Sequence, residues 1–122
     1  MTRAVLEGVS FGLRDSLEAL KTTAVDVKSL IAIGGGSASN YWLKLLATVL
    51  NLSLELPKGR EFGAALGAAR LGMIAETGAE PADIMIAPEA HDIIKPQEDL
   101  VNAYDIAYHR FTDSYSGLKN IQ

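Results

Sequence analysis

A run of small residues, Gly34-Gly35-Gly36-Ser37-Ala38-Ser39-Asn40, is the part of the sequence best suited to ligand chemistry. It lies between an apolar run, Ser29–Ile33, and a segment with helical spacing, so it predicts a turn from a strand into a helix. Glycine lets a ligand approach the main chain, and the first N–H groups of a helix have no intrahelical acceptor. With the positive end of the helix dipole, these features favour an anion or a nucleotide. The alternative is a tight turn that binds no ligand.

Two common nucleotide motifs do not fit this run. The Gly-Lys-Ser/Thr ending of a P-loop is absent. The dinucleotide fingerprint needs a third glycine where Ser39 stands, although Glu55 lies about where that fingerprint places its ribose-binding acid. A Rossmann-like dinucleotide-binding module is therefore kept as a rival interpretation.

Other polar and aromatic residues each have a functional and a structural interpretation. The trio Lys58-Gly59-Arg60 either faces a phosphate or forms a solvated turn. Trp42 either stacks on adenine or, as its spacing with Leu45 and Leu46 favours, belongs to the core. The remaining titratable candidates are interpreted as surface, capping or partner-satisfied residues, and the histidines are too far apart for a structural zinc site: His91, His109, Asp15, Asp26 and Asp105.

A strand, a helix and a second strand are predicted to position the glycine turn. Residues 29–33 predict a central parallel strand buried on both faces. The helix after the turn is capped by Ser37 or Ser39, and its buried side carries Trp42, Leu45, Leu46 and Val49. Leu52, Leu54 and Leu56 alternate with polar residues up to Pro57, which predicts a half-buried strand. This βαβ unit, with a right-handed crossover, indicates an α/β fold.

The flanking segments predict helices and one long connection. Residues 3–20 place Val5, Val9, Leu13, Leu17 and Leu20 on one core-facing stripe. Residues 62–77 form a glycine- and alanine-rich helix, for which we expect close approach to a sheet or a ligand. Residues 78–96 are a connection, and residues 97–115 form a last helix that stops by Gly117. Its packing stripe is Leu100, Tyr104, Ala107, Tyr108, Phe111 and Tyr115.

Two parallel strands make an incomplete sheet, so the remaining strands come either from upstream in a longer protein or from self-association. The chain has 122 residues, enough for one domain, with a net charge of −4 and no cysteine. Nucleic acid, disulfides and thiolate metal sites are therefore not expected. No apolar run reaches the roughly 18 residues of a membrane span, and we expect a soluble cytoplasmic protein.

The residues now support a family resemblance. Residues 30–42 resemble the adenosine motif of the FGGY carbohydrate kinases, which belong with actin and Hsp70 to one ATPase superfamily. Residues 61–71 resemble the small-residue helix that follows this motif in the members acting on xylulose. The resemblance implies that residues 1–122 are the C-terminal portion of the nucleotide-side domain, with part of an actin-like (ribonuclease H-like) fold.

The resemblance also implies an activity and a site. ATP and Mg²⁺ are the expected cofactors, and Gly34, Gly35, Gly36, Ser37 and Asn40 are the expected ATP-binding residues. The implied reaction is phosphorylation of a ketopentose, D-xylulose first, with the sugar bound by an N-terminal domain. The family's base belongs to an Asp-x-x-Gly motif that this chain lacks, so no catalytic residue is assigned and the isolated chain is expected to be inactive. The alternative is a non-catalytic nucleotide-binding or assembly module, with a homodimer possible.

Overall fold

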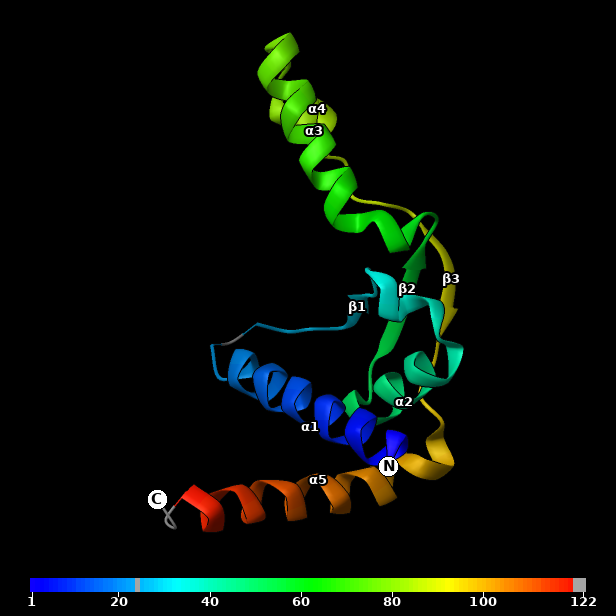
Figure 1. Cartoon of the computed structure of the whole chain (residues 1–122), viewed down its shortest axis with the longest axis vertical. Helices are drawn as coiled ribbons and strands as arrows, with labels where there is room; N and C mark the ends of the chain where they lie inside the picture. The colour runs from blue at the N-terminus through cyan, green and yellow to red at the C-terminus, as the bar shows by residue number, and fades with distance from the viewer. Residues whose placement is uncertain (24, 120–122) are drawn as a thin grey trace.

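The structure is a computed structural model that describes residues 1–23 and 25–119 (Figure 1). Its elements, in chain order, are α1 (Thr2–Lys21), β1 (Ser29–Ile31), the 3-10 helix η1 (Gly35–Ala38), α2 (Asn40–Leu50), β2 (Ser53–Pro57), the 3-10 helix η2 (Arg60–Phe62), α3 (Gly63–Thr77), α4 (Pro81–Ile84), β3 (Ala90–Ile94) and α5 (Glu98–Lys119). The predicted strand-helix-strand unit is confirmed, because α2 connects β1 to β2 and the two strands pair in parallel.

The described sheet has the strand order β1-β2-β3, which differs from the prediction in two ways. First, β1 lies at an edge rather than in the centre, and Ile31 and Ile33 are 48% and 57% exposed. The buried central strand is β2, where Leu54 and Leu56 point into the core. Second, residues 90–94, predicted as part of a connection, form a strand antiparallel to β2. Only Ile94 of β3 packs on the core, so apolar alternation gave no sign of this strand.

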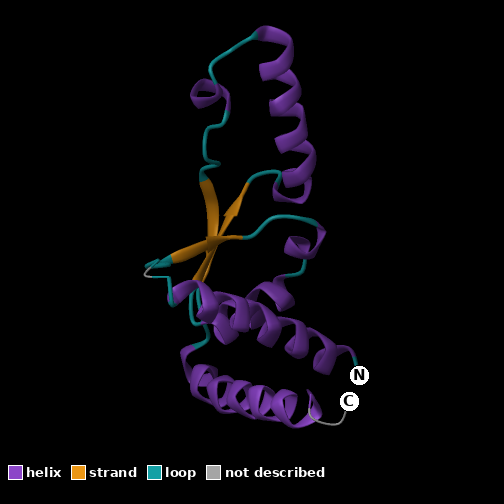
Figure 2. Cartoon of the chain, turned by 90° about the vertical axis from the view of Figure 1, so that its left-hand side faces the viewer, coloured by secondary structure: helices purple, strands orange, loops and turns teal. Residues whose placement is uncertain are grey.

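Helix α2 occupies the middle of the molecule because both of its sides are apolar. One side packs Leu43 and Ala47 against Leu54 and Leu56 of β2. The opposite side packs Leu45 and Val49 against Phe11 of α1 and Tyr108 of α5, in a second cluster. The sheet, α2 and the α1–α5 pair therefore form successive layers (Figures 1 and 2). Asn51, in the left-handed region at φ 50°, ends α2 and returns the chain into β2.

The two terminal helices were predicted correctly as helices, but their details differ. In α1 the buried residues are Ser10, Phe11 and Leu17. The rest of the predicted stripe is exposed: Val5 63%, Val9 45%, Leu13 46% and Leu20 54%. In α5 the aromatic stripe does pack on α1, through Phe11, Tyr104, Tyr108 and Phe111, whereas Tyr115 is exposed. Helix α5 also continues through Gly117 to Lys119, since a single glycine costs a helix only about 1 kcal/mol.

Helices α3 and α4 project from the carboxyl end of β2, away from the α1–α5 layer (Figures 1 and 2). None of the residues that the structure describes in α3 is buried. The expected close approach is confirmed only at Gly63, where an added Cβ would lie 3.0 Å from Ile33 Cβ. At Gly67 and Gly72 close approach to the sheet is wrong, because an added Cβ would meet nothing within 4 Å, and approach to a ligand stays a prediction.

Candidate nucleotide-binding site

The glycine turn is held together by its own main chain. Gly34 adopts φ 91°, a left-handed conformation that favours glycine, and its carbonyl accepts hydrogen bonds from Ser37 N at 3.0 Å and Ser37 Oγ at 2.7 Å. These bonds close the turn over Gly35 and Gly36 and start η1. The amides of Gly35 and Gly36 occupy its first positions, where N–H groups have no intrahelical acceptor. The turn thus offers main-chain donors at an exposed position.

The two serines of the turn have different roles. Ser39 is the N-cap of α2, since its Oγ accepts a hydrogen bond from Trp42 N at 3.3 Å. Ser37 is only 3% exposed and donates its hydroxyl to Gly34, so it stabilises the turn from inside. Of the two predicted caps, Ser39 is therefore correct. Asn40, the first residue of α2, is exposed beside the turn and can contact a ligand.

Trp42 lies against the turn and belongs to the core side of α2. An added Cβ at Gly36 would stand 2.9 Å from Trp42 Cζ3, so the indole covers this glycine. The ring is partly buried and packs on the cluster of Phe11 and Val49, as predicted for a core residue. Its Nε1 is buried without a hydrogen-bond partner among the described residues. Glycine at position 36 is thus required by packing, whatever the ligand.

Arg60 meets the glycine turn, a contact that the sequence interpretation missed. The carboxyl ends of parallel strands β1 and β2 lie at one edge of the sheet, so the segments that follow them, η1 and η2, are neighbours. Arg60 O accepts from Gly34 N at 2.7 Å, and Arg60 Nε donates to Ser37 O at 3.1 Å. Adjacent carboxyl edges are where open α/β sheets bind ligands. The positional signal was present in Lys58-Gly59-Arg60, since it follows the second strand.

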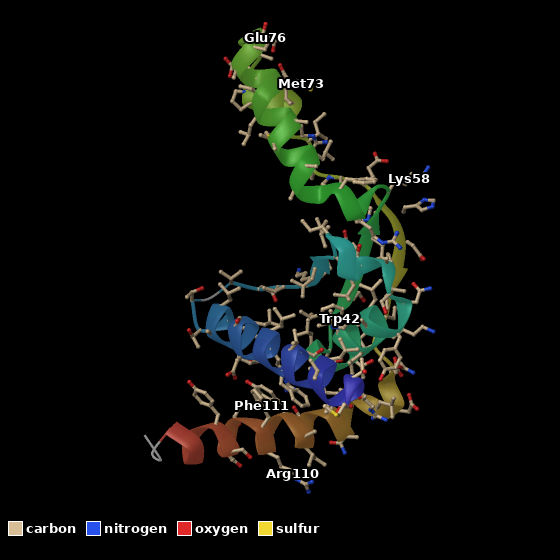
Figure 3. All side chains as sticks on the ribbon, in the orientation of Figure 1. Trp42, Lys58, Met73, Glu76, Arg110 and Phe111 are labelled. Carbon is tan, nitrogen blue, oxygen red and sulfur yellow. The ribbon has the colours of Figure 1, made fainter. Side chains whose placement is uncertain are left out.

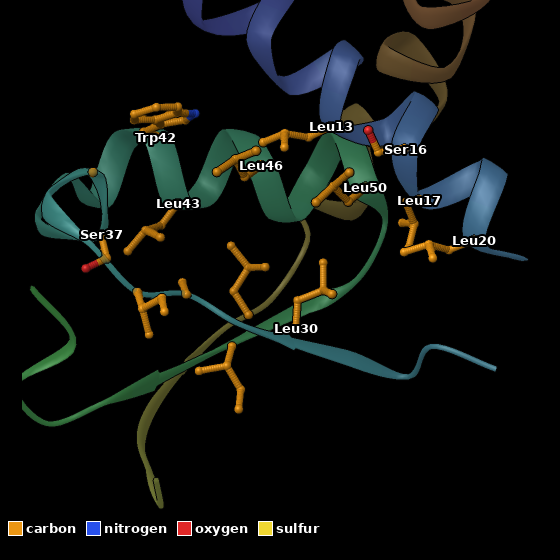
Figure 4. A pocket seen from close by; sticks show the side chains of 15 residues that line it. Leu13, Ser16, Leu17, Leu20, Leu30, Ser37, Trp42, Leu43, Leu46 and Leu50 are labelled. Atoms are coloured by element: carbon orange, nitrogen blue, oxygen red, sulfur yellow. The ribbon is translucent and has the colours of Figure 1, made fainter. Parts of the chain in front are cut away.

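Two hollows flank this edge. The larger, of about 480 Å³, lies between α1, α2 and β1 and is lined mainly by apolar side chains such as Leu30, Leu43 and Leu46 (Figure 4). It reaches only the inner side of the turn at Gly36 and Ser37, so we assign it to an open core and not to nucleotide. The smaller, of about 290 Å³, is lined by Lys58, Arg60, Arg70 and apolar residues from the end of β1, from α3 and from the segment after α4.

The other candidate residues take structural positions. Glu55 Oε1 accepts from Ser29 Oγ at 2.6 Å, which ties its carboxylate to the neighbouring strand. Asp15 Oδ1 accepts from Tyr108 OH at 2.6 Å, and Asp26 lies 3.7 Å from Lys28 Nζ. His91 is exposed. Asp105 pairs with Arg14 and lies 3.7 Å from His109, and the Arg14 hydrogen bond lowers the pKa of the Asp105 carboxyl.

Metal-ligand clusters and membrane-spanning helices are absent from the described residues. They hold no cluster of His, Cys, Asp or Glu side chains that could bind a metal ion. None of the helices within residues 1–23 and 25–119 is long and apolar enough to cross a membrane.

The chain is similar in sequence to proteins that are named as kinases of xylulose or of L-xylulose. Over 75 residues the chain is 41% identical to the xylulose kinase of Escherichia coli K12, an alignment that covers 62% of this chain and 16% of the relative. Over 121 residues it is 31% identical to a probable L-xylulose kinase of Haemophilus influenzae, covering 99% of this chain and 24% of the relative. The chain thus spans no more than about a quarter of the length of these relatives.

Solved structures agree. A crystal structure of a "xyloylose kinase" from Brucella ovis matches with a TM-score of 0.84 and 50% identity, over 99% of this chain and 25% of that one. Xylulose kinase from Rhodospirillum rubrum matches with a TM-score of 0.75 and 26% identity, over 98% and 24%. These likenesses give the chain the fold of the FGGY sugar kinases, an actin-like ATPase fold. The sequence model of the family's C-terminal domain matches residues 1–76. The chain belongs to the FGGY family of carbohydrate kinases and contains a C-terminal part of that fold.

Proposed function

We propose that this chain supplies the nucleotide-binding side of a cytoplasmic ATP-dependent sugar kinase. The proposed substrate is a ketopentose, and D-xylulose is the ketopentose that we expect it to prefer. The observation that carries the proposal is the exposed glycine turn at the carboxyl edge of β1 and β2, formed by the residues that resemble the family's adenosine motif. Relatives named as kinases of xylulose and of L-xylulose support a ketopentose as the substrate. Which enantiomer is used has to be measured.

The turn suits ATP through its main chain and its exposed residues. The amides of Gly35 and Gly36 stand at the exposed start of η1, Gly35 has open space on its side-chain side, and the α2 helix dipole adds positive potential at the same place. Asn40 lies beside the turn and would contact the adenine or its sugar. Gly34 and Ser37 would support ATP binding indirectly, since the hydrogen bonds from Ser37 to the Gly34 carbonyl fix the conformation of the turn. Bound ATP supplies the phosphoryl group that is transferred.

Mg²⁺ would reach this site with the nucleotide. The described residues hold no cluster of metal-ligating side chains. Mg²⁺ in such enzymes commonly binds through substrate phosphates, waters and one or two carboxylates. We therefore assign no Mg²⁺ ligand to the residues of this chain.

The sugar and its base are assigned to the regions that the relatives have and this chain does not. In-line transfer needs a sugar hydroxyl that loses its proton to a base while the γ-phosphate is presented opposite it. Closure of two domains over the pair would exclude water, which otherwise competes as acceptor. The role of this chain is to bind and orient the nucleotide half.

Calorimetry tests the nucleotide half directly. We expect Mg-ADP to bind the chain and NAD not to bind. The variant Gly35→Ala should weaken Mg-ADP at least about tenfold, because its methyl would stand in the ligand's path, while the free chain keeps its stability. Tight NAD binding would favour the Rossmann-like rival, and absence of any nucleotide binding would reject the proposal.

Substrate assays test the sugar half on a protein that joins this chain to the remaining regions of its relatives. D-xylulose, L-xylulose, L-ribulose, glycerol and gluconate should be compared, with D-xylulose expected to give the highest kcat/KM. Phosphorylation of none of these sugars would contradict the kinase assignment.

A second proposal concerns assembly. Phe62, Leu66, Leu71 and Met73, which belong to α3 or border it, are between 45% and 64% exposed, and Tyr115 of α5 is 63% exposed. Apolar surface of this kind favours association in water. We propose that the isolated chain forms a homodimer through these faces. Sedimentation equilibrium should give twice the monomer mass, and a monomer at high micromolar concentration would refute it.

A further inference from the structure

We infer that Arg60 is a positioning residue for the nucleotide, because it locks the glycine turn in the conformation that presents its amides. The inference rests on the proposed function. Its basis is a two-way link between loops that are distant in sequence. The Arg60 carbonyl accepts from Gly34 N at 2.7 Å, and its Nε donates to Ser37 O at 3.1 Å. Arg60 therefore makes hydrogen bonds to both Gly34 and Ser37, the residues that flank Gly35 and Gly36.

Arg60 is itself well fixed. It begins η2 directly after Gly59, which adopts φ 64° and lets the chain bend back toward the turn. Phe62 N donates to Gly59 O at 3.0 Å and closes η2 over Arg60. The Arg60 side chain is half-buried, so its hydrogen bond is partly shielded from water. Arg60, held at the carboxyl end of β2, thus fixes the conformation of the loop that follows the neighbouring strand β1.

The turn needs an external support because of its composition. Glycines lose more conformational freedom than other residues when they are ordered, so a stretch of glycines is intrinsically mobile. Inside the turn, ordering comes from the Ser37 bonds to Gly34 and from the Trp42 ring over Gly36. Without the Arg60 side chain, the Ser37 carbonyl keeps the same position only at an entropic cost, while the main-chain bond from Gly34 N to residue 60 remains. A nucleotide would then pay that cost on binding, which lowers its affinity.

The guanidinium charge suggests a competing role, direct contact with a phosphate, and the two roles make different predictions. A residue that orders the turn affects every ligand that uses the turn, including uncharged adenosine. A residue that only attracts phosphate affects ADP and leaves adenosine unchanged. Arg70 is a matched control, since it lines the same 290 Å³ hollow but donates through Nη1 to Ile86 O at 2.9 Å, on the α3–α4 side. Figure 3 shows Lys58, which precedes Arg60, pointing outward from the loop.

The experiment compares wild type, Arg60→Met, Arg60→Lys and Arg70→Met as full 122-residue chains. Methionine is unbranched and has no hydrogen-bond donor, so Arg60→Met removes the bond to Ser37 O. Binding of Mg-ADP and of adenosine is followed by the emission of Trp42, the single tryptophan of the chain, which lies against the turn. We expect Arg60→Met to weaken both ligands by about tenfold and by the same factor. Arg60→Lys, which can still donate to Ser37 O, should lose no more than about threefold, and Arg70→Met should match wild type.

Hydrogen exchange on the free chains gives a readout that does not depend on ligand. The amide of Ser37, which donates to Gly34 O inside the turn, should exchange at least about tenfold faster in Arg60→Met than in Arg70→Met, while amides in the middle of α2 stay equally protected. Such a pattern also shows that the variant is folded. If Arg60→Met unfolds, Arg60→Ala, which also lacks the donor, carries the comparison.

Each other outcome overturns the inference in an identifiable way. Equal affinities for wild type and Arg60→Met would show that the turn needs no support from the Arg60 side chain, with the proposed function intact. Loss of Mg-ADP affinity with adenosine unchanged would make Arg60 a phosphate contact instead. Wild type that binds neither ligand would reject the proposed function together with this inference.

Discussion

Gly36 shows how a single residue in the candidate site is constrained by packing before any ligand is considered. An alanine Cβ there would stand 2.9 Å from Trp42 Cζ3, closer than side chains tolerate. Either the indole or the turn has to move, and overpacking of this kind costs about 1–3 kcal/mol. We expect Gly36→Ala to lower the free energy of unfolding in urea by that amount and to shift the Trp42 emission.

Gly35→Ala is the control for this prediction. An added Cβ at position 35 meets nothing within 4 Å, so stability should stay within about 0.5 kcal/mol of wild type. Equal stability losses in the two variants would show that backbone freedom, and not the Trp42 contact, selects glycine at position 36.

Tyr108 predicts a loss of stability at alkaline pH. Burial, followed by its hydrogen bond to Asp15, raises the pKa of the Tyr108 hydroxyl to about 12 from an ordinary value of 10.0. Asp15 and Glu18 disfavour the phenolate, Arg14 lies 4.2 Å from the ring centroid and favours it, and His109 contacts the ring. The unfolded chain releases this proton first, so stability is full below pH 10 and declines between about pH 10 and 12.

Urea unfolding as a function of pH tests this assignment, with Tyr108→Phe as the comparison. The phenylalanine variant should lose part of the decline between about pH 10 and 12, since it keeps the ring and removes the ionisable group. An identical pH profile in both chains would show that other groups cause the alkaline loss.

At the scale of elements, α3 carries glycines that its own structure does not require. Gly67 and Gly72 lie inside the helix, and a Cβ at either position would meet nothing within 4 Å. Glycine in an exposed helix interior costs about 0.5–1 kcal/mol relative to alanine. Gly67→Ala and Gly72→Ala should therefore each raise the free energy of unfolding by that amount, measured by circular dichroism in urea.

Gly63 separates helix propensity from contact in the same helix. An alanine Cβ there would lie 3.0 Å from Ile33 Cβ, so we expect Gly63→Ala to destabilise the chain, opposite in sign to the other two. If Gly67→Ala and Gly72→Ala also destabilise the chain, α3 is packed closely in solution, for example in the proposed homodimer.

The elements could be predicted where local pattern and burial coincide. Leu54 and Leu56 alternate and are buried, so β2 was predicted correctly, and Ser39 was correct as a cap because its geometry is local. Strand β3 was not predictable, since its residues are mostly exposed and it forms by main-chain pairing with β2. In the site, the turn was visible as a continuous segment. Arg60 was visible as part of a trio that could face a phosphate, but its contact with Ser37 was not, because that contact spans 23 positions.

At the scale of the whole molecule, apolar spacing indicates which side of a helix is meant to be buried, but it does not identify the segment that covers that side. Val5, Val9 and Leu13 have the spacing of a core stripe, yet each is at least 45% exposed here. Leu13 and the edge strand β1 line the 480 Å³ hollow. Figure 3 shows the contrast in α5, where Phe111 points toward α1 and Arg110 points away. The chain spans no more than about a quarter of its relatives, so its sequence carries burial signals for contacts that these residues alone cannot make.

If this chain holds only the nucleotide half of the site, it should bind nucleotide without catalysing phosphoryl transfer to a sugar. Phosphoryl transfer needs a nucleotide, a sugar and a base in one geometry, and positioning of the pair supplies most of the rate. In the proposed function the glycine turn serves only the nucleotide, and no aspartate of the 122 residues stands in an Asp-x-x-Gly motif. With Mg-ATP and D-xylulose, a coupled assay should therefore detect no ADP release above the rate without sugar.

In the same solution, Mg-ADP should still stabilise the fold. A ligand that binds only the folded chain adds about 2.7 kcal/mol at 100 times its Kd, which appears as a higher midpoint of thermal unfolding. Gly35→Ala, with Mg-ADP weakened at least about tenfold, should show at most about half of this stabilisation at the same ligand concentration, since its free chain is unchanged while its turn is obstructed. Sugar-dependent ADP release by the chain would mean that a base and a sugar site lie within these residues. The division of labour proposed for the kinase would then be wrong, even with the nucleotide turn correctly placed.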